Sequence, residues 1–260
     1  ICYADNLVVQ AEIFHLWVIE KPANMSIAAL RKEFPAEKAG LNVLIAESEA
    51  PYHERKVTLL NGPHTVLSPI AFLSGVDIVR DALHHPVIGK YIKKVQYEEL
   101  MQTLNLPIAE LQQFAADVLE RFDNPYVDHA VTSIMLNSFP KFQTRDPPGL
   151  KTYLQRKGEL PKGLVLGLAA IITYYKGGKR ADGTAIQPND DSKIMQLLTD
   201  LWATGCTRTV AEGVLGAQDL IWKEHGNLND IPGLTDMLTF YLDQIQEKGM
   251  LATVRGIVTE

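Results

Sequence analysis

The chain has 260 residues and a formal net charge of -6; 46% of its residues are hydrophobic and 22% are charged. These values are ordinary for a globular protein with one large domain or two small ones. The acidic balance, without a stripe of Lys and Arg, argues against a nucleic-acid-binding protein. The two cysteines, Cys2 and Cys206, cannot form a disulfide framework or a zinc site, so a reducing cytoplasm is predicted.

No segment is typical of a membrane protein or of a leader sequence. The longest apolar run, Gly163 to Tyr175, is shorter than the ~20 residues that span a bilayer, and it predicts a buried core helix. The N-terminus lacks the basic, apolar and small-residue regions of a signal peptide. Because the chain begins at Ile1 and opens on an apolar segment, we expect a piece of a longer protein, with removal of a purification tag as the alternative.

Residues 1–50 predict a small β-containing segment. Residues 7–9 and 14–19 are mostly β-branched, aromatic or apolar, as in one or two strands, and residues 41–46 predict another short strand. We expect these strands to belong to a sheet that is completed elsewhere.

From residue 51 onward the pattern becomes helical, and residues 51–260 predict one helical domain. Pro86, Pro107 and Pro125 stand near helix starts, where a missing backbone N–H has little effect. The polar segment 178–190 predicts an exposed loop. Apolar residues at helical spacing predict helices over 54–75, 77–84, 87–104, 108–122, 126–137, 150–157, 161–176, 189–203, 207–224 and 234–248.

One mostly apolar segment, RKVTLLNGPHTVLSPIAFLSG, contains Lys56, Asn61 and His64. At 100° per residue the three side chains fall within an arc of about 140° on one helix. Pro63 is expected to bend that helix and to free a carbonyl near Leu59. A buried polar trio requires hydrogen-bond partners, and a substrate with several hydroxyl groups would supply them. The alternative is two satisfied core side chains and a solvated lysine.

The spacing of this trio resembles the K-x4-N-x2-H motif of the polyol-specific long-chain dehydrogenases, the mannitol dehydrogenase family. Ala11–Glu20 is similar to the family's A-E-x-F-x-x-W-V-I-E segment, and Arg121–Pro125 to its R-F-x-N-P. Lys141 stands where the family has a lysine that contacts the substrate. The resemblance implies a mainly α, multi-helix C-terminal dehydrogenase domain of the 6-phosphogluconate dehydrogenase type, preceded in the whole protein by a Rossmann domain.

The resemblance also implies a mechanism. Lys56 would be the general acid/base, while Asn61 and His64 would hold the reacting oxygen, and NAD would be bound mainly by the Rossmann domain. No glycine-rich phosphate motif occurs in this chain, so we expect the fragment alone to be inactive. No metal is expected, because the lysine takes the role of a Lewis acid. We expect residues 57–60 to bury the lysine and lower its pKa from ~10.4.

Other segments favour the tagaturonate-reducing branch of the family. Leu59–Thr65, Asn124–His129 and Leu136–Arg145 are similar to that branch's I-L-N-G-A-H-T, N-P-Y-I-K-H and L-N-G-M-T-K-F-R-T-R. The polyol enzymes carry an arginine, an aspartate and a glutamate at the positions of Ser133, Asn137 and His53. These departures argue against an uncharged polyol. The implied reaction interconverts D-tagaturonate with NADH and D-altronate with NAD.

A uronate carries a carboxylate, and we predict that Lys141 and Arg145, four residues apart, bind it. Two solvated surface cations are the alternative. His15, His53 and His129 are further candidates for the pocket, each with a structural histidine as its alternative. Two other pairs have no predicted function: the sequence predicts an exposed helix end at His84–His85 and a solvated helical face at Glu98–Glu99.

Two rival functions stay open at this point. A sister activity, reduction of fructuronate or a mannitol-type reaction, would use the same residues. A non-catalytic helical binding or scaffolding domain would instead leave the trio dispersed or packed into the core. In either enzymatic case the expected partners are a small sugar acid or polyol and the protein's own Rossmann domain, with no nucleic acid and no membrane.

Overall fold

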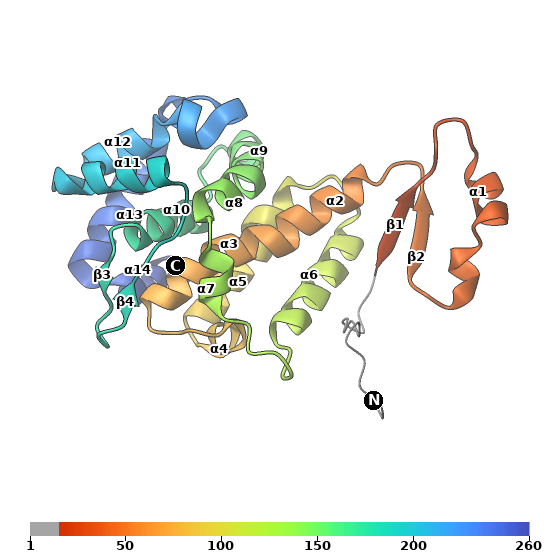
Figure 1. The fold of residues 1–260 in the computed structure, drawn as a ribbon, viewed down its shortest axis with the longest axis horizontal. Helices are drawn as coiled ribbons and strands as arrows, with labels where there is room; N and C mark the ends of the chain where they lie inside the picture. The colour runs from red at the N-terminus through yellow and green to blue at the C-terminus, as the bar shows by residue number, and fades with distance from the viewer. Residues whose placement is uncertain (1–15, 260) are drawn as a thin grey trace. The chain divides into compact units, whose positions relative to one another are not determined.

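A computed structural model describes residues 16–259 of the chain, and Figure 1 shows its helices and strands. The chain divides into two compact units, residues 1–54 and residues 55–260. We predicted a change of structure between residues 50 and 51, and the observed division lies a few residues further on, inside the helix that begins at Ala50.

The N-terminal unit contains a parallel pair of strands. β1 (Trp17–Glu20) pairs with β2 (Val43–Ala46), with Trp17 opposite Val43. The connection contains α1 (Ile27–Glu33) and a 3-10 turn (Ala36–Ala39), as a parallel crossover requires. The strand predicted at 41–46 is therefore present and begins two residues later. The strand predicted at 7–9, and His15 with it, lie outside the described residues.

The second unit is helical, and most of the predicted helices are present. Its α-helices are α2 (Ala50–Lys56, which begins in the first unit), α3 (Gly62–Leu73), α4 (Val79–His84), α5 (Ile88–Lys93), α6 (Ile108–Phe122), α7 (Val131–Met135), α8 (Ser138–Arg145), α9 (Pro147–Lys157), α10 (Lys162–Tyr174), α11 (Ser192–Ala203), α12 (Thr207–Leu215), α13 (Leu234–Lys248) and α14 (Met250–Val258). π-helical segments span Val57–Asn61, Lys94–Glu99 and Gln218–Trp222, and short 3-10 turns span Leu100–Thr103, Lys223–His225 and Leu228–Asp230. Two short antiparallel strands, β3 (Gly178–Lys179) and β4 (Ala185–Ile186), form a hairpin.

Helices α8 and α14 were not predicted. Pro140 lies in the first turn of α8, and Pro147 begins α9, positions where proline leaves no helical hydrogen bond unmade. One proline thus lies in the first turn of a helix and the other is a helix start. The helix predicted over 126–137 is reduced to α7, because residues 124–130 form a loop.

The core of this unit is built around α10, as the apolar run predicted. Its residues from Gly163 to Ile172 are all buried, and α10 packs against α3 and α13. A Cβ atom on Gly167 would lie 2.3 Å from Cβ of Val66, so only glycine allows α10 and α3 to approach this closely. Among the described residues, no helix combines the length and apolar character needed to cross a bilayer.

The prediction of a solvated Glu98–Glu99 pair is wrong for Glu99. Its side chain is buried, and its carboxylate accepts hydrogen bonds from the backbone N–H groups of Gly163 (2.7 Å) and Leu164 (3.0 Å) at the start of α10. Those N–H groups have no partner within the helix, so a carboxylate from a neighbouring segment satisfies them. Burial raises the pKa of Glu99 to about 7.

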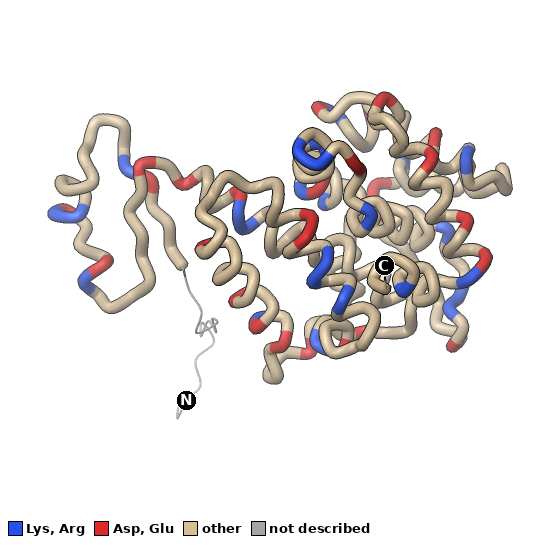
Figure 2. Tube along the Cα trace, turned by 180° about the vertical axis from the view of Figure 1, so that it is seen from behind, with Lys and Arg blue, Asp and Glu red and all other residues tan. Residues whose placement is uncertain are grey.

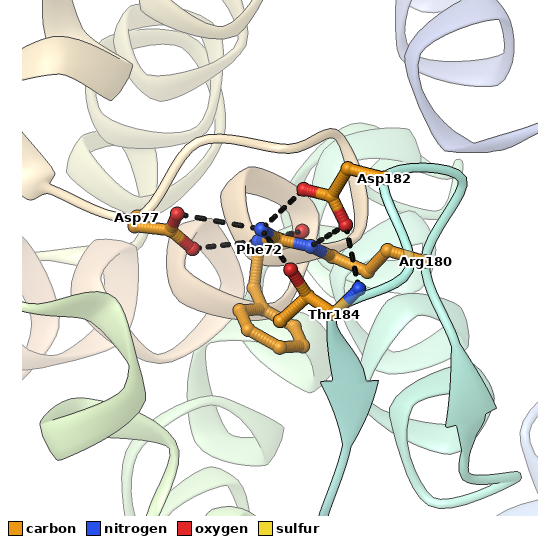
Figure 3. Close-up of polar contacts among 5 residues, drawn as sticks. All are labelled: Phe72, Asp77, Arg180, Asp182 and Thr184. Carbon is orange, nitrogen blue, oxygen red and sulfur yellow. Dashed lines mark hydrogen bonds and ion pairs between the residues drawn. The ribbon is translucent and has the colours of Figure 1, made fainter.

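The segment 178–190 is also more ordered than predicted. The Arg180 guanidinium donates to Asp77 (2.6 Å), Asp182 (2.7 Å), Thr184 (3.1 Å) and the carbonyl of Phe72 (3.1 Å), and lies 4.6 Å from the centre of the Phe72 ring (Figure 3). Only 5% of its side chain is exposed. The prediction of an exposed loop is therefore wrong for Arg180, which ties the hairpin to the C-terminal end of α3.

Replacement of Arg180 by methionine is expected to lower the free energy of unfolding by roughly 1.5–3 kcal/mol, because a nearly buried cation loses several hydrogen bonds to charged groups. Urea denaturation of the purified chain measures this change. Arg208→Met is the matched control, since that arginine also binds two carboxylates but is 54% exposed, and a much smaller loss is expected. Equal losses in the two variants would contradict the structural role of Arg180.

Charged residues are interspersed along the helices. Figure 2 shows Lys and Arg alternating with Asp and Glu over the described chain instead of gathering in one stripe.

Candidate active site

The predicted trio lies on one helical rod with an irregular turn in its middle. A π-helical segment, Val57–Asn61, joins α2 to α3, and the Gly62 N–H donates to the carbonyl of Val57, five residues back. Such π-turns are rare and occur frequently at functional sites. The angles that we derived for an ideal α-helix therefore do not apply between Lys56 and Asn61.

Pro63 explains where the regular pattern fails. In an α-helix its backbone nitrogen would donate to the carbonyl of Leu59, but proline has no N–H. The carbonyl of Leu59 instead accepts a hydrogen bond of 2.9 Å from Nε2 of Gln96, a fully buried side chain on the π-helical segment Lys94–Glu99. The prediction of a freed carbonyl near Leu59 is thus confirmed.

Two buried polar atoms of the trio lack partners among the described residues. Oδ1 of Asn61 and Nε2 of His64 are buried, and neither makes a hydrogen bond with a described residue. The His64 ring stacks on Phe122 at 3.8 Å with an angle of 13° and lies 5.6 Å from the ring of His129. Burial, and then the neighbouring charge of His129, lowers the pKa of His64 to about 3. His64 is therefore neutral at physiological pH.

The expected burial of Lys56 is wrong for the described chain. Its side chain is exposed, whereas Leu59 points into the core and does not cover the ammonium group. Its pKa is still lowered, first by partial desolvation and then by the positive charges of Arg145 and Arg121. The same two arginines lower the pKa of His64, so charges from α6 and α8 converge on the trio.

The two predicted carboxylate ligands lie on α8, one turn apart. Nη1 of Arg145 donates to Oγ1 of Thr65 at 2.9 Å, and this is its one hydrogen bond to a described residue. Nζ of Lys141 donates to the carbonyl of Ile134 at 2.6 Å. Burial lowers the pKa of both residues, and the charge of Arg145 adds to this effect on Lys141. Each retains N–H donors beyond these single bonds, since a guanidinium carries five and an ammonium three.

The structure does not bring all predicted residues together. The ring of His129 lies 5.6 Å from that of His64, although the His129 side chain is exposed, and its role in a pocket stays a prediction. His53 is exposed on α2 in the other unit, and its role stays a prediction. Sequence reasoning did not assign Phe122 or Thr65 to the site. The signal for Phe122 was present in the R-F-x-N-P pattern, and Thr65 ends the segment that is similar to I-L-N-G-A-H-T.

The helical unit that carries this lysine, asparagine and histidine on one interrupted helix is a dehydrogenase domain. Residues 50–246 match the family model of the mannitol dehydrogenase C-terminal domain, and the chain belongs to this family. The predicted family and the mainly helical fold are therefore confirmed.

Two relatives of this chain are both named altronate oxidoreductase. The chain is 73% identical over 256 residues to altronate oxidoreductase of Bacteroides thetaiotaomicron, covering 98% of this chain and 52% of the relative. It is 40% identical over 250 residues to altronate oxidoreductase of Bacillus subtilis, covering 95% of this chain and 48% of the relative. The chain thus spans about half the length of the curated relatives it matches.

Solved structures support the fold. Mannitol 2-dehydrogenase of Pseudomonas fluorescens, in a ternary complex with NAD and D-mannitol, superposes with a TM-score of 0.73 at 19% identity, over 85% of this chain and 44% of that one. A substrate-free D-sorbitol dehydrogenase gives a TM-score of 0.73 at 21% identity, over 93% of this chain and 46% of that one.

Proposed function

We propose that the full-length protein is a cytoplasmic NAD-dependent oxidoreductase that interconverts D-tagaturonate and D-altronate, and that this chain supplies its acid/base and substrate-binding residues. The observation that carries the proposal is the pair of buried atoms, Asn61 Oδ1 and His64 Nε2, which have no hydrogen-bond partner among residues 16–259 and lie on one interrupted helix with a lysine of lowered pKa. A sugar presents hydroxyl and carbonyl groups that match such atoms. A scaffold has no need for them.

Lys56 is proposed as the group that exchanges a proton with the reacting oxygen. During reduction the carbonyl oxygen gains negative charge, which an adjacent ammonium stabilises before donating a proton to it. In the oxidation direction the neutral amine takes the proton back. A lowered pKa suits this exchange, because an unperturbed lysine near ~10.4 holds its proton too tightly at neutral pH.

Neutral His64 and Asn61 are proposed to orient the substrate. A histidine with a pKa of about 3 carries one ring proton at physiological pH and adds no charge beside the lysine. Its stacking on Phe122 fixes the plane of the ring, so Nε2 is held in one direction. Asn61 contributes a carbonyl oxygen that accepts a hydrogen bond from a substrate hydroxyl.

Arg145 and Lys141 are proposed to bind the carboxylate of the sugar acid. Arg145 uses one of its N–H groups on Thr65, which leaves the remaining donors for a planar carboxylate. The altronate oxidoreductase name of the relatives, down to 40% identity, agrees with an acidic substrate. Lys56, Arg121 and Arg145 together favour an anion at this position.

NAD would be held mainly by the part of the protein that precedes this chain. When bound, NADH supplies the hydride for the substrate carbon. The residues described above fit that chemistry, because Nε2 of His64, when it carries the ring proton, can donate to a substrate carbonyl, Oδ1 of Asn61 can accept from a substrate hydroxyl, and Lys56 handles the proton. The P. fluorescens enzyme, whose C-terminal part has this fold, was solved with NAD and D-mannitol.

A substrate panel on the full-length protein tests the proposal. NADH oxidation at 340 nm is to be followed with D-tagaturonate, D-fructuronate and D-fructose, and NAD reduction with D-altronate, D-mannonate and D-mannitol. We expect the highest kcat/KM with D-tagaturonate and D-altronate. A preference for fructuronate and mannonate, or for the uncharged pair, would assign the protein to a sister activity instead.

A further inference from the structure

Arg145 and Asp146, at the junction of α8 and α9, both contact the helical turn that carries Asn61. Nη1 of Arg145 donates to Oγ1 of Thr65 at 2.9 Å, and the same hydroxyl donates to the backbone carbonyl of Asn61 at 2.8 Å. A hydroxyl has one proton and two lone pairs, so it makes both bonds at once. Thr65 is buried. Its hydroxyl links the guanidinium of Arg145 to the backbone carbonyl of Asn61.

Asp146 packs against the same turn at Gly62. A Cβ atom at Gly62 would lie 2.9 Å from Oδ1 of Asp146, so the carboxyl group packs directly against the backbone next to Asn61. The Asp146 side chain is fully buried, and neither of its oxygens accepts a hydrogen bond from a described residue. Burial raises the pKa of Asp146 well above its ordinary value, and the neighbouring charge of Arg145 opposes this effect only in part. The two neighbouring residues therefore hold one turn of the helix at two points.

We propose that Thr65 is a positioning residue that couples substrate recognition by Arg145 to the alignment of Asn61. Thr65 fixes the guanidinium of Arg145, which receives the substrate carboxylate, relative to the backbone of Asn61, which faces the reacting oxygen. A substrate with its carboxylate on Arg145 then has its reacting carbon at a set distance from Asn61. This inference rests on the proposed function and adds a residue that determines specificity for a sugar acid.

A pair of substitutions isolates the hydroxyl group. Thr65→Val keeps the shape of the side chain and removes the hydroxyl, whereas Thr65→Ser keeps the hydroxyl. In the full-length protein we expect Thr65→Val to lower kcat/KM for D-tagaturonate roughly 10- to 100-fold, because a hydrogen bond to a charged group is lost. Thr65→Ser is expected to stay within about 3-fold of the unchanged protein. If Thr65→Val does not fold, Thr65→Ala against Thr65→Ser gives the same comparison.

Thr253→Val is the matched control. Thr253 is also buried and also donates to the carbonyl four residues back, that of Gly249, but no arginine donates to it. The loss of such a bond alone is expected to leave kcat/KM unchanged. Equal losses in Thr65→Val and Thr253→Val would overturn the proposal, because a general effect on helix stability would explain both.

A double-mutant cycle with Arg145→Met provides the decisive measurement. If Thr65 acts through Arg145, the double variant is expected to have the same kcat/KM as Arg145→Met alone, whereas independent effects multiply. Multiplying effects would overturn the coupling. This failure is distinguishable from failure of the proposed function, since the unchanged protein would still reduce D-tagaturonate and Lys56→Met would still abolish that activity.

Discussion

Replacement of Lys56 by methionine in the full-length protein is expected to lower kcat for D-tagaturonate reduction by roughly 10²–10⁴-fold, the usual contribution of a positioned acid or base. Methionine keeps most of the length of the side chain and removes the ammonium group. Binding of the sugar acid should change less than kcat, because Arg145 and Lys141 are intact. Stopped-flow measurement of NADH oxidation, with D-tagaturonate titrated, separates the two parameters.

The pH dependence of the unchanged protein has a defined sign. Because the pKa of Lys56 is lowered from 10.5, the ammonium that reduction needs is lost as the pH rises through a value below 10.5. The rate of D-tagaturonate reduction should therefore fall at high pH. Oxidation of D-altronate needs the neutral amine, and its rate should rise over the same range. Both limbs should be absent from Lys56→Met.

A surface lysine serves as the control for this prediction. Lys193 is exposed on α11, and its replacement by methionine is expected to leave kcat and the pH profile unchanged. Retention of full activity by Lys56→Met would remove the acid/base assignment and with it the mechanism proposed for the site.

Loss of Arg145 is the second large effect that we expect. In Arg145→Met, kcat/KM for D-tagaturonate should fall roughly 30- to 3,000-fold, as when one partner of a close charge pair is truncated at a cost of about 2–5 kcal/mol. Arg145→Lys should recover only part of this loss, because an ammonium cannot make two parallel bonds to a carboxylate. Most of the change should appear in KM, provided that chemistry is slow relative to substrate release.

Two further measurements distinguish carboxylate binding by Arg145 from a simple loss of protein stability. The charge of Arg145 lowers the pKa of Lys56, so the alkaline limb of the reduction rate should move to higher pH in Arg145→Met. An uncharged ketose such as D-fructose should lose less activity than the uronate. Arg208→Met, on an exposed ion pair remote in sequence, is the control and should change neither readout. Equal losses with the uronate and with the ketose would contradict a carboxylate-binding role.

Local sequence features predicted much of the fold. The apolar run at α10 predicted a buried helix, because a segment that is apolar on every face requires protein on all sides. Pro63 predicted a carbonyl without its helical partner, because proline lacks an N–H whatever its surroundings. The spacing of Lys56, Asn61 and His64 predicted that the three residues share a helix, since helical periodicity is a property of the chain itself.

The errors arose where neighbours distant in sequence decide the environment. Glu99 resembles a solvated helical residue until the start of α10, more than sixty positions away, supplies two N–H donors. Arg180 resembles a loop cation until Asp77 and Phe72 enclose it. A charged side chain carries no local signal of such partners, because burial depends on how distant segments pack.

The amino-acid sequence by itself indicated most of the helices, the family and the candidate polar trio, since each follows from spacing and residue type along one stretch of chain; it did not indicate α8 or α14. Only the tertiary structure placed Arg145 on Thr65, a contact between residues 80 positions apart. The same is true of the stacking of Phe122 on His64 and of the exposure of Lys56. These features set pKa values and hydrogen-bond geometry, which depend on distances in space and not on separation along the chain.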